Sequence, residues 1–325
     1  MPIVSPSGQN VAQQIGPVGA PATAQYSYRK MVGFLLEFNP DLPVQVAQGF
    51  LQIAYRRILD HANFYGTLVK GLVTVPDNIS TGTASVTTAS TTITGVGTAF
   101  DPVMVGRQFR VGFSNPIYTI ATVTSATQLD LDFPWGGKTQ AGVGYQIFQN
   151  IVSFGNNIKR LLAVVNQRQG YRMQLHVPQE VLNARDVWRT TTGWTHTVAS
   201  YAPSPDGQPQ FELYPAPTFQ QSFPFLAYVQ PPDFLNDNDT PVLSIRSDVI
   251  LYGALPHVLR FRGKNSKYYD PETANYYENL FHMELEKMDK NADALYPRWL
   301  LYEFAKVPAY GQGASFWQSH EDYPG

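Results

Sequence analysis

The chain contains no cysteine. Without thiols it has no disulfide framework, no thiolate zinc site and no cysteine nucleophile. Charged residues make up only 15% of its 325 residues, and the formal net charge is −2. This balance argues against a protein that binds nucleic acid mainly through bulk positive charge, although it does not exclude contact with DNA that passes through a pore.

Long hydrophobic runs are also missing. No stretch of about 18 apolar residues occurs, so the sequence predicts no membrane span. The start Met1-Pro2-Ile3-Val4-Ser5 lacks a basic segment followed by an apolar one, which predicts no signal peptide. Together with the absence of cysteine, this is typical of a protein made in a reducing cytoplasm.

The sequence shows no motif of a common enzyme class. There is no P-loop, no Gly-x-Gly-x-x-Gly after a strand and no Gly-x-Ser-x-Gly elbow. Asp237 and Asp239 could belong to a calcium loop, but the following glycine and terminal glutamate are missing, which favours a solvated turn. We therefore predict no catalysis, no cofactor and no metal site. The histidines are scattered and form no metal-binding pair: His61, His176, His196, His257, His282 and His320.

Turn-forming and aromatic residues are abundant instead. Glycine and proline number 25 each, and tyrosine and phenylalanine 19 each. Tyrosine offers a large apolar contact with a polar tip, which suits interfaces that stay partly wet, but an aromatic β-rich core would give the same composition.

Residues 43–65 predict an amphipathic helix. Asp41 is the expected cap, Pro43 lies in the first turn and Gly66 ends the helix. Arg56 and Arg57 lie off the apolar stripe, where they belong either to a solvated face or to a contact between subunits. The stripe consists of residues spaced three and four apart: Ala47, Leu51, Ala54, Tyr55, Ile58, Ala62 and Tyr65.

Residues 71–149 are rich in Ser, Thr and Gly and predict a small antiparallel barrel or sandwich inserted into the core. Turn residues separate several short alternating runs. These predicted strands are 83–86, 91–94, 108–111, 118–123, 128–131 and 145–148.

The remaining pattern mixes strands and helices. Pro178 begins a short helix that ends near Asp186, and Pro256 should kink a helix over 247–262. The sequence Asp270-Pro271-Glu272 predicts the start of a third helix. Strands are expected at 158–166, 171–177, 194–201, 210–215 and 223–229. The apolar face of the third helix is Ala274, Tyr277, Phe281, Leu285, Met288 and Ala292.

A basic cluster follows the second of these helices. It either offsets the negative end of the helix dipole or faces DNA in a channel or an acidic surface of a partner. Its members are His257, Arg260, Arg262, Lys264 and Lys267.

Both ends of the chain are poor in regular patterns. Residues 1–30 are rich in small and polar residues and predict a disordered tail or an arm that orders against a neighbour. The segment 306–325 carries exposed aromatic residues, which suggests docking into a groove on a partner. Those aromatic residues are Tyr310, Phe316, Trp317 and Tyr323.

An ordered series of motifs runs through the last third of the chain. A strand ends in Tyr214-Pro215-Ala216-Pro217, and the next ends in Pro231-Pro232. An Asp-rich turn at 236–241 then leads to a helix that carries Tyr252-Gly253-Ala254-Leu255. This order resembles the head-to-tail adaptor (connector) proteins of tailed bacteriophages, over roughly residues 155 to 293 and more weakly over the helix at 43–65. The β segment 71–149 is similar to Thr-rich modules of phage neck, tail and fibre-attachment proteins.

The resemblance implies an α+β fold in which helices pack with an antiparallel β core. That core would comprise residues 31–70 and 150–305, carry the inserted all-β domain 71–149, and have extended arms at 1–30 and 306–325. The expected function is a dodecameric ring in the virion neck, between portal and tail. It would extend the DNA channel, seal the filled head and provide a platform for tail assembly.

The implied partners are the portal protein, tail, nozzle or tail-fibre proteins, further copies of the chain, and double-stranded DNA without sequence readout. In the family, the C-terminal region commonly engages the portal, which indicates the aromatic segment 306–325 as the docking element. The main alternative is a receptor- or carbohydrate-binding tail protein that acts through the Thr-rich module. Fibres are usually trimers with repetitive shafts, and this chain has no such repeat. A virion hydrolase is a third reading, against which the missing catalytic constellation argues.

Overall fold

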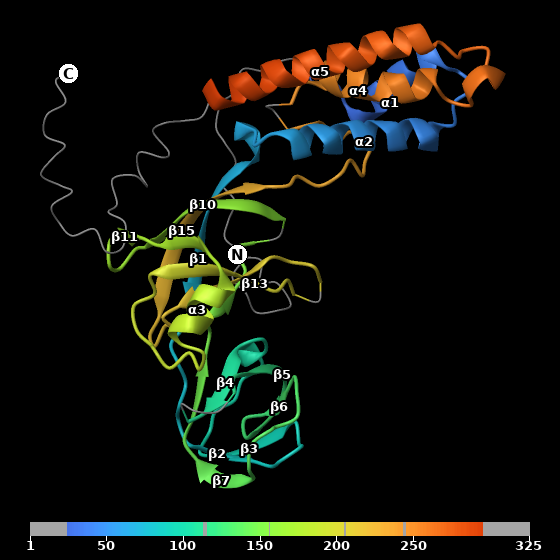
Figure 1. Cartoon of the computed structure of the whole chain (residues 1–325). Coiled ribbons are helices and arrows are strands. Elements are labelled where there is room, and N and C mark those ends of the chain that lie inside the picture. The colour runs from blue at the N-terminus through green and yellow to red at the C-terminus, as the bar shows by residue number, and fades with distance from the viewer. Residues whose placement is uncertain (1–24, 113–115, 156, 205, 243–244, 295–325) are drawn as a thin grey trace, which may run out of the picture. The chain divides into compact units, whose positions relative to one another are not determined.

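The computed structural model describes residues 25–112, 116–155, 157–204, 206–242 and 245–294 (Figure 1). This part of the chain contains five α-helices and three mainly antiparallel sheets, so the protein is α+β, as predicted. It divides into two compact units. Within the described residues, the helical unit consists of 25–69 and 228–294, and the β unit of 70–227. The predicted core of 31–70 and 150–305 coincides with neither unit, because its residues 150–227 belong to the β unit.

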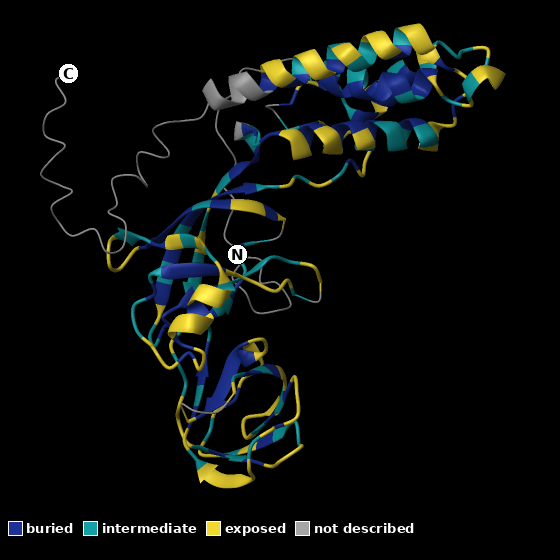
Figure 2. Ribbon diagram, in the orientation of Figure 1, coloured by how far each residue is buried: buried dark blue, intermediate teal, exposed yellow. Residues whose placement is uncertain are grey.

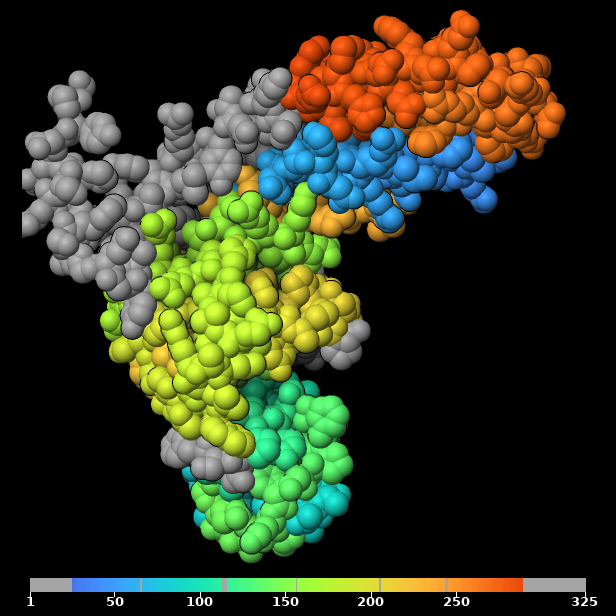
Figure 3. Space-filling model, in the orientation of Figure 1, coloured from blue at the N-terminus to red at the C-terminus, as the bar shows by residue number. Residues whose placement is uncertain are grey.

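Four helices form the helical unit: α1 (Tyr28–Phe38), α2 (Val44–His61), α4 (Ser247–Leu259) and α5 (Pro271–Ala294). Helix α4 is apolar on all sides and packs against the other three, which is the pattern expected of a central, buried helix. Figure 2 shows α4 largely buried, whereas α5 and α2 carry exposed residues along their outer faces. The space-filling view shows the same two helices at the surface of this unit (Figure 3).

The helix boundaries confirm some capping predictions and correct others. Asp270 Oδ1 accepts the Thr273 N–H at 3.0 Å, so the predicted start of α5 is right. Asp41 does not cap α2. Its N-cap is Pro43, whose carbonyl already accepts the N–H groups of Val46 and Ala47, so Asp41 lies two residues too early. The same helix ends at His61, and a separate 3₁₀ turn spans Tyr65–Thr67, so Gly66 does not end it.

The Asp-rich turn has a structural role in this unit that the sequence did not reveal. The carbonyl oxygens of Asp239 and Asp237 accept the N–H groups of Tyr28 and Arg29 at 2.8 and 3.0 Å. These donors belong to the first turn of α1 and have no partner within the helix. The Asp239 carboxylate accepts the backbone N–H groups of Asn236 and Leu235, which lower its pKa and hold the turn together. The turn therefore fixes the N-terminus of α1.

The β unit contains two four-stranded sheets and one seven-stranded sheet. The first runs in the order β1 (Leu68–Val75), β15 (Gln221–Val229), β10 (Ile158–Asn166) and β11 (Tyr171–Arg172). The second runs in the order β12 (Gln174–Val177), β13 (Thr197–Tyr201), β14 (Gln210–Tyr214) and β9 (Ile151–Val152), with the short helix α3 (Gln179–Arg185) packed against β13. The Tyr214–Pro215 peptide bond after β14 is cis.

The seven-stranded sheet curls on itself and encloses its own aromatic core around Phe109, Trp135 and Tyr145 (Figure 1). All six predicted strands of this segment are present. The unpredicted strand β7 is largely exposed, so it lacks the alternation that identifies a half-buried strand. In sheet order the strands are β7 (Gln140–Val143), β2 (Thr83–Val86), β3 (Thr92–Val96), β6 (Gln128–Leu131), β5 (Tyr118–Ser125), β4 (Gln108–Val111) and β8 (Tyr145–Phe148).

Candidate functional surfaces

The predicted basic cluster lies in the loop that joins α4 to α5. Arg260 is exposed, but its Nη2 donates to Asn275 Oδ1 at 2.6 Å and to Glu278 Oε2 at 2.8 Å on α5. The hydrogen bond from Arg260 lowers the pKa of Glu278. Arg260 therefore links the loop to α5 and does not present an unpaired charge.

The other three cations of the cluster face solvent. Arg262 has a positive φ of 59° at the start of a 3₁₀ turn, and its guanidinium carbon lies 5.4 Å from the centre of the Phe261 ring. Lys267 Nζ lies 4.7 Å from the Tyr268 ring, and a hydrogen bond to Tyr268 raises the pKa of this lysine. Within the described residues Arg262, Lys264 and Lys267 form no ion pair, so their charges are available to a partner.

His257, the fifth member, lies apart from these exposed cations. Its ring is half-buried and stacks on Phe50 with centroids 5.4 Å apart. Burial lowers the pKa of His257, and the neighbouring Arg57 lowers it further. Because a lowered pKa favours the neutral ring, His257 adds no positive charge to this surface near neutral pH.

Arg56 and Arg57 lie on the exposed face of α2, and both have partners within the chain. Arg56 pairs with Asp233 through two hydrogen bonds, and this pairing lowers the pKa of Asp233. The Arg57 guanidinium lies 5.2 Å from the centre of the Phe281 ring on α5. The apolar side chain of Ile53 is exposed one turn earlier on this face. A subunit contact through these arginines remains a prediction.

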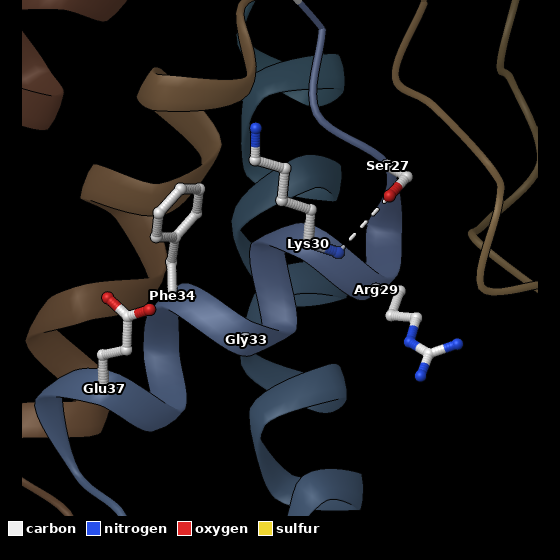
Figure 4. Close-up of a pocket in the computed structure, with 6 residues that line it drawn as sticks. All are labelled: Ser27, Arg29, Lys30, Gly33, Phe34 and Glu37. Atoms are coloured by element: carbon white, nitrogen blue, oxygen red, sulfur yellow. Dashed lines mark hydrogen bonds between the residues drawn. The ribbon is translucent and has the colours of Figure 1, made fainter.

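A hollow of about 450 Å³ lies along α1 (Figure 4). Gly33 has no side chain to fill the hollow, and a Cβ built there would meet no atom within 4 Å. Arg29 and Lys30 extend in different directions, and Glu37 lies at the other end of the hollow. Its charged groups therefore do not converge on one ligand position. The lining residues are Ser27, Arg29, Lys30, Gly33, Phe34 and Glu37.

The β unit contains a buried ion pair that the sequence did not reveal. Arg189 and Glu212 are 8% and 3% exposed and form two hydrogen bonds with each other. The arginine also donates to the Asp186 carbonyl and to Asn183 Oδ1, and Asn150 Nδ2 donates to the Glu212 carboxylate at 3.2 Å. No periodic signal marks either residue, since only the fold brings them together. Both charged groups of this pair have hydrogen-bond partners within the protein, as in a network with a structural role.

The same region joins the seven-stranded sheet to the second sheet. Arg110 on β4 is 1% exposed, and its Nη1 donates to the carbonyl oxygens of Trp188 and Arg189 at 3.3 and 2.9 Å. The Gln108 side chain accepts the Asn150 N–H at 3.1 Å. These bonds explain why residues 150–227 fall in one compact unit with 70–149.

Several predicted features lie outside the described residues. They are the N-terminal segment 1–24 and the aromatic docking candidates Tyr310, Phe316, Trp317 and Tyr323. The predicted N-terminal arm of 1–30 is wrong at its end, because residues 28–30 form the first turn of α1. Within the described part of the chain, no group of histidine, aspartate and glutamate side chains has the arrangement of a metal site. No helix among these residues is long and apolar enough to cross a membrane.

No protein-family model matches the chain, and no curated protein is significantly similar to it.

The cations of the α4–α5 loop are spread over an exposed surface, whereas Arg189 and Glu212 are buried and paired with each other.

Proposed function

We propose that the chain is a structural virion protein that forms a ring between the portal and the tail of a tailed bacteriophage. The ring extends the DNA channel, seals the filled head and provides a platform for tail assembly. The proposal rests on the ordered motif series of the last third of the chain. Three of its motifs, Pro231-Pro232, the Asp-rich turn and Tyr-Gly-Ala-Leu, belong to the helical unit, whereas Tyr214-Pro215-Ala216-Pro217 follows β14 in the β unit.

The packing of these motifs supports this reading. Asp233, next to Pro231-Pro232, pairs with Arg56 of α2, and the Asp-rich turn binds the N-terminus of α1. Gly253, in the Tyr-Gly-Ala-Leu stretch, lies where α4 touches both α2 and α5. The three motifs between Pro231 and Leu255 thus take part in the packing of one helical unit.

The proposed organisation keeps an adaptor core, an inserted β domain at 71–149 and extended arms at the two ends of the chain, at 306–325 and at the residues that precede α1. The inserted domain would present an attachment surface to tail, nozzle or tail-fibre proteins. The aromatic residues of 306–325 would dock on the portal. In the virion neck, Arg262, Lys264 and Lys267 would face either the DNA in the channel or an acidic partner surface.

A closed ring needs two different contact faces on each subunit. Exposed apolar side chains lie on three helices of the helical unit: Phe38 on α1, Val44 and Ile53 on α2, and Tyr276 and Met283 on α5. In Figure 1, α2 and α5 lie along two sides of this unit, with α4 and α1 between them. We propose that the α2 face of one copy packs against the α5 face of the next.

Native mass spectrometry of the full chain, alone and mixed with its cognate portal ring, tests the proposal. We expect a portal-dependent ring, and we expect deletion of 306–325 to abolish portal binding while the remaining chain stays folded. A truncated chain that still binds the portal would exclude this segment as the docking element. A stable trimer that ignores the portal would instead favour the receptor- or carbohydrate-binding alternative.

A further inference from the structure

Three loops of the β unit meet at one place: the turn between β10 and β11, the loop that precedes β13, and the loop between β14 and β15. A hollow of about 390 Å³ lies there, lined by residues of the first and third of these loops and of β15. The hollow is lined by Gln167, Arg168, Gln220 and Ser222. All four are polar side chains that can form hydrogen bonds with a ligand, and the volume is within the range of small-ligand sites.

Arg168 is held in place by aromatic rings. Its guanidinium carbon lies 5.3 Å from the centre of the Trp194 ring and 5.4 Å from that of Phe219. The two rings contact each other edge to face, with centroids 4.3 Å apart. An arginine that lies against aromatic faces keeps its in-plane N–H groups available for hydrogen bonds.

The polar groups of the hollow are mostly unused. Within the described residues, Arg168 forms no ion pair or hydrogen bond, and the side-chain amides of Gln167 and Gln220 have no hydrogen-bond partner. Ser222 Oγ is 3.2 Å from Thr74 Oγ1, and Asp77 Oδ1 accepts the backbone N–H of Gln220 at 2.7 Å. One cation and two amides are therefore available to a ligand.

A buried network beneath the hollow fixes the three loops relative to one another. Asn166, Thr195 and Gln221 are each almost completely buried. Asn166 Nδ2 donates to the Thr195 carbonyl at 3.1 Å and to Gln221 Oε1 at 3.0 Å, and Gln221 Nε2 donates to the Gly193 carbonyl at 2.9 Å. None of their side-chain atoms lacks a partner. Such a satisfied network makes the site above it rigid before a ligand binds.

We propose that this hollow binds a small polyhydroxylated ligand through a single carboxylate or phosphate group. The Arg168 guanidinium would hold the anionic group, because its planar fork matches two oxygens of a carboxylate or phosphate. The amides of Gln167 and Gln220 would bind neighbouring hydroxyl groups. This inference is independent of ring formation, since every residue it uses belongs to the β unit.

Calorimetric titration of the full chain with glucuronate, glucose 6-phosphate and neutral glucose tests the site. We expect saturable binding of at least one of the two acids, and binding of glucose weaker by about tenfold or more, since charge-assisted hydrogen bonds contribute about 1.5–3 kcal/mol. Comparison of glucuronate with glucose 6-phosphate distinguishes a carboxylate from a phosphate ligand. Equal binding of glucose, or no saturation by either acid below about 10 mM, would overturn the proposal.

Substitution of Arg168 separates the site from nonspecific attraction. We expect Arg168→Ala to weaken binding of the acid by roughly 10- to 100-fold, and Arg168→Lys to restore only part of it because lysine lacks the planar fork. Arg160→Ala is the matched control, since Arg160 is an exposed arginine on β10, the strand that precedes the turn with Arg168. Unchanged binding in Arg168→Ala, or equal loss in Arg160→Ala, would contradict the assignment.

Discussion

Gly253 shows how one residue sets the spacing of the helical unit. A Cβ built there would lie 2.8 Å from Phe281 Cε2 and 3.0 Å from Ala54 Cβ, closer than packed side chains allow. Glycine within a helix costs about 1 kcal/mol relative to alanine. Glycine is nevertheless required here, because α4 approaches α2 and α5 too closely for a side chain to fit between them.

Gly253→Ala should destabilise the helical unit. The added methyl group forces packed helices apart at a cost of about 1–3 kcal/mol, which exceeds the gain in helix propensity. Gly49→Ala on α2 is the control, because a Cβ there meets no atom within 4 Å and the change should stabilise the helix. Urea unfolding followed by helical circular dichroism measures both. Similar effects of the two changes would contradict the packing account.

The buried pair Arg189–Glu212 should be costly to break. Glu212→Ala leaves a buried guanidinium without its counter-charge, and we expect a loss of about 3–5 kcal/mol in the free energy of unfolding. The double variant Arg189→Met/Glu212→Leu removes both charges and should recover much of this loss. A double variant no more stable than Glu212→Ala would show that the pair is not the source of the effect.

At the scale of the elements, much of the β unit could be predicted from the sequence because its strands alternate. The strands 108–111, 128–131 and 145–148 have the predicted bounds. The segment 171–177 is instead divided into two short strands in different sheets, a change that no local pattern encodes. Helix α1 was missed, although Ser27 caps it locally by accepting the Lys30 N–H at 3.4 Å. The carbonyl groups that bind the N–H groups of its first turn lie about 200 residues away, which no local pattern shows.

His257 should make the stability of the helical unit depend on pH. Its pKa is lowered by burial and then by Arg57, whereas an unfolded histidine titrates near pH 6.5. As the pH falls below about 6.5, the unfolded chain gains a proton that the folded chain resists. The stabilisation present above this pH is therefore lost as the pH falls through the lowered pKa.

The expected result is a smaller loss of stability between about pH 7.5 and 5 in His257→Leu than in the unaltered chain. Urea unfolding at several pH values measures this slope. His282→Leu serves as the control, because His282 lies on the exposed face of α5. An unchanged slope in His257→Leu, or the same reduction in His282→Leu, would contradict this assignment.

At the scale of the molecule, the sequence indicated which residues are charged or aromatic but not which of them are free to bind a partner or a ligand. For Arg260 the sequence left open whether it offsets the helix dipole or faces a partner, and the structure pairs it with Glu278. The hollow at Arg168 depends on three loops that are distant in sequence, so no motif could identify it. The adaptor function was inferred from the motif series and remains a proposal.

Ring formation should depend on the exposed face of α2. We expect Ile53→Asp to prevent assembly with the portal while the chain stays folded, because a charge would enter the proposed apolar contact. Val44→Asp is the control, since Val44 lies on the same helix with similar exposure, 51% against 47% for Ile53, but on the opposite face. Size-exclusion chromatography with portal present distinguishes the two variants. Equal assembly of both would exclude this face as a ring contact.

The number of copies bound to the cognate portal ring is the most direct measure of the proposed function. Native mass spectrometry of the purified complex gives this number from its total mass. The account predicts a ring with one copy for each portal subunit, a dodecamer on a dodecameric portal, and no such ring without the portal. A stable trimer whose mass is unchanged by the portal would contradict it.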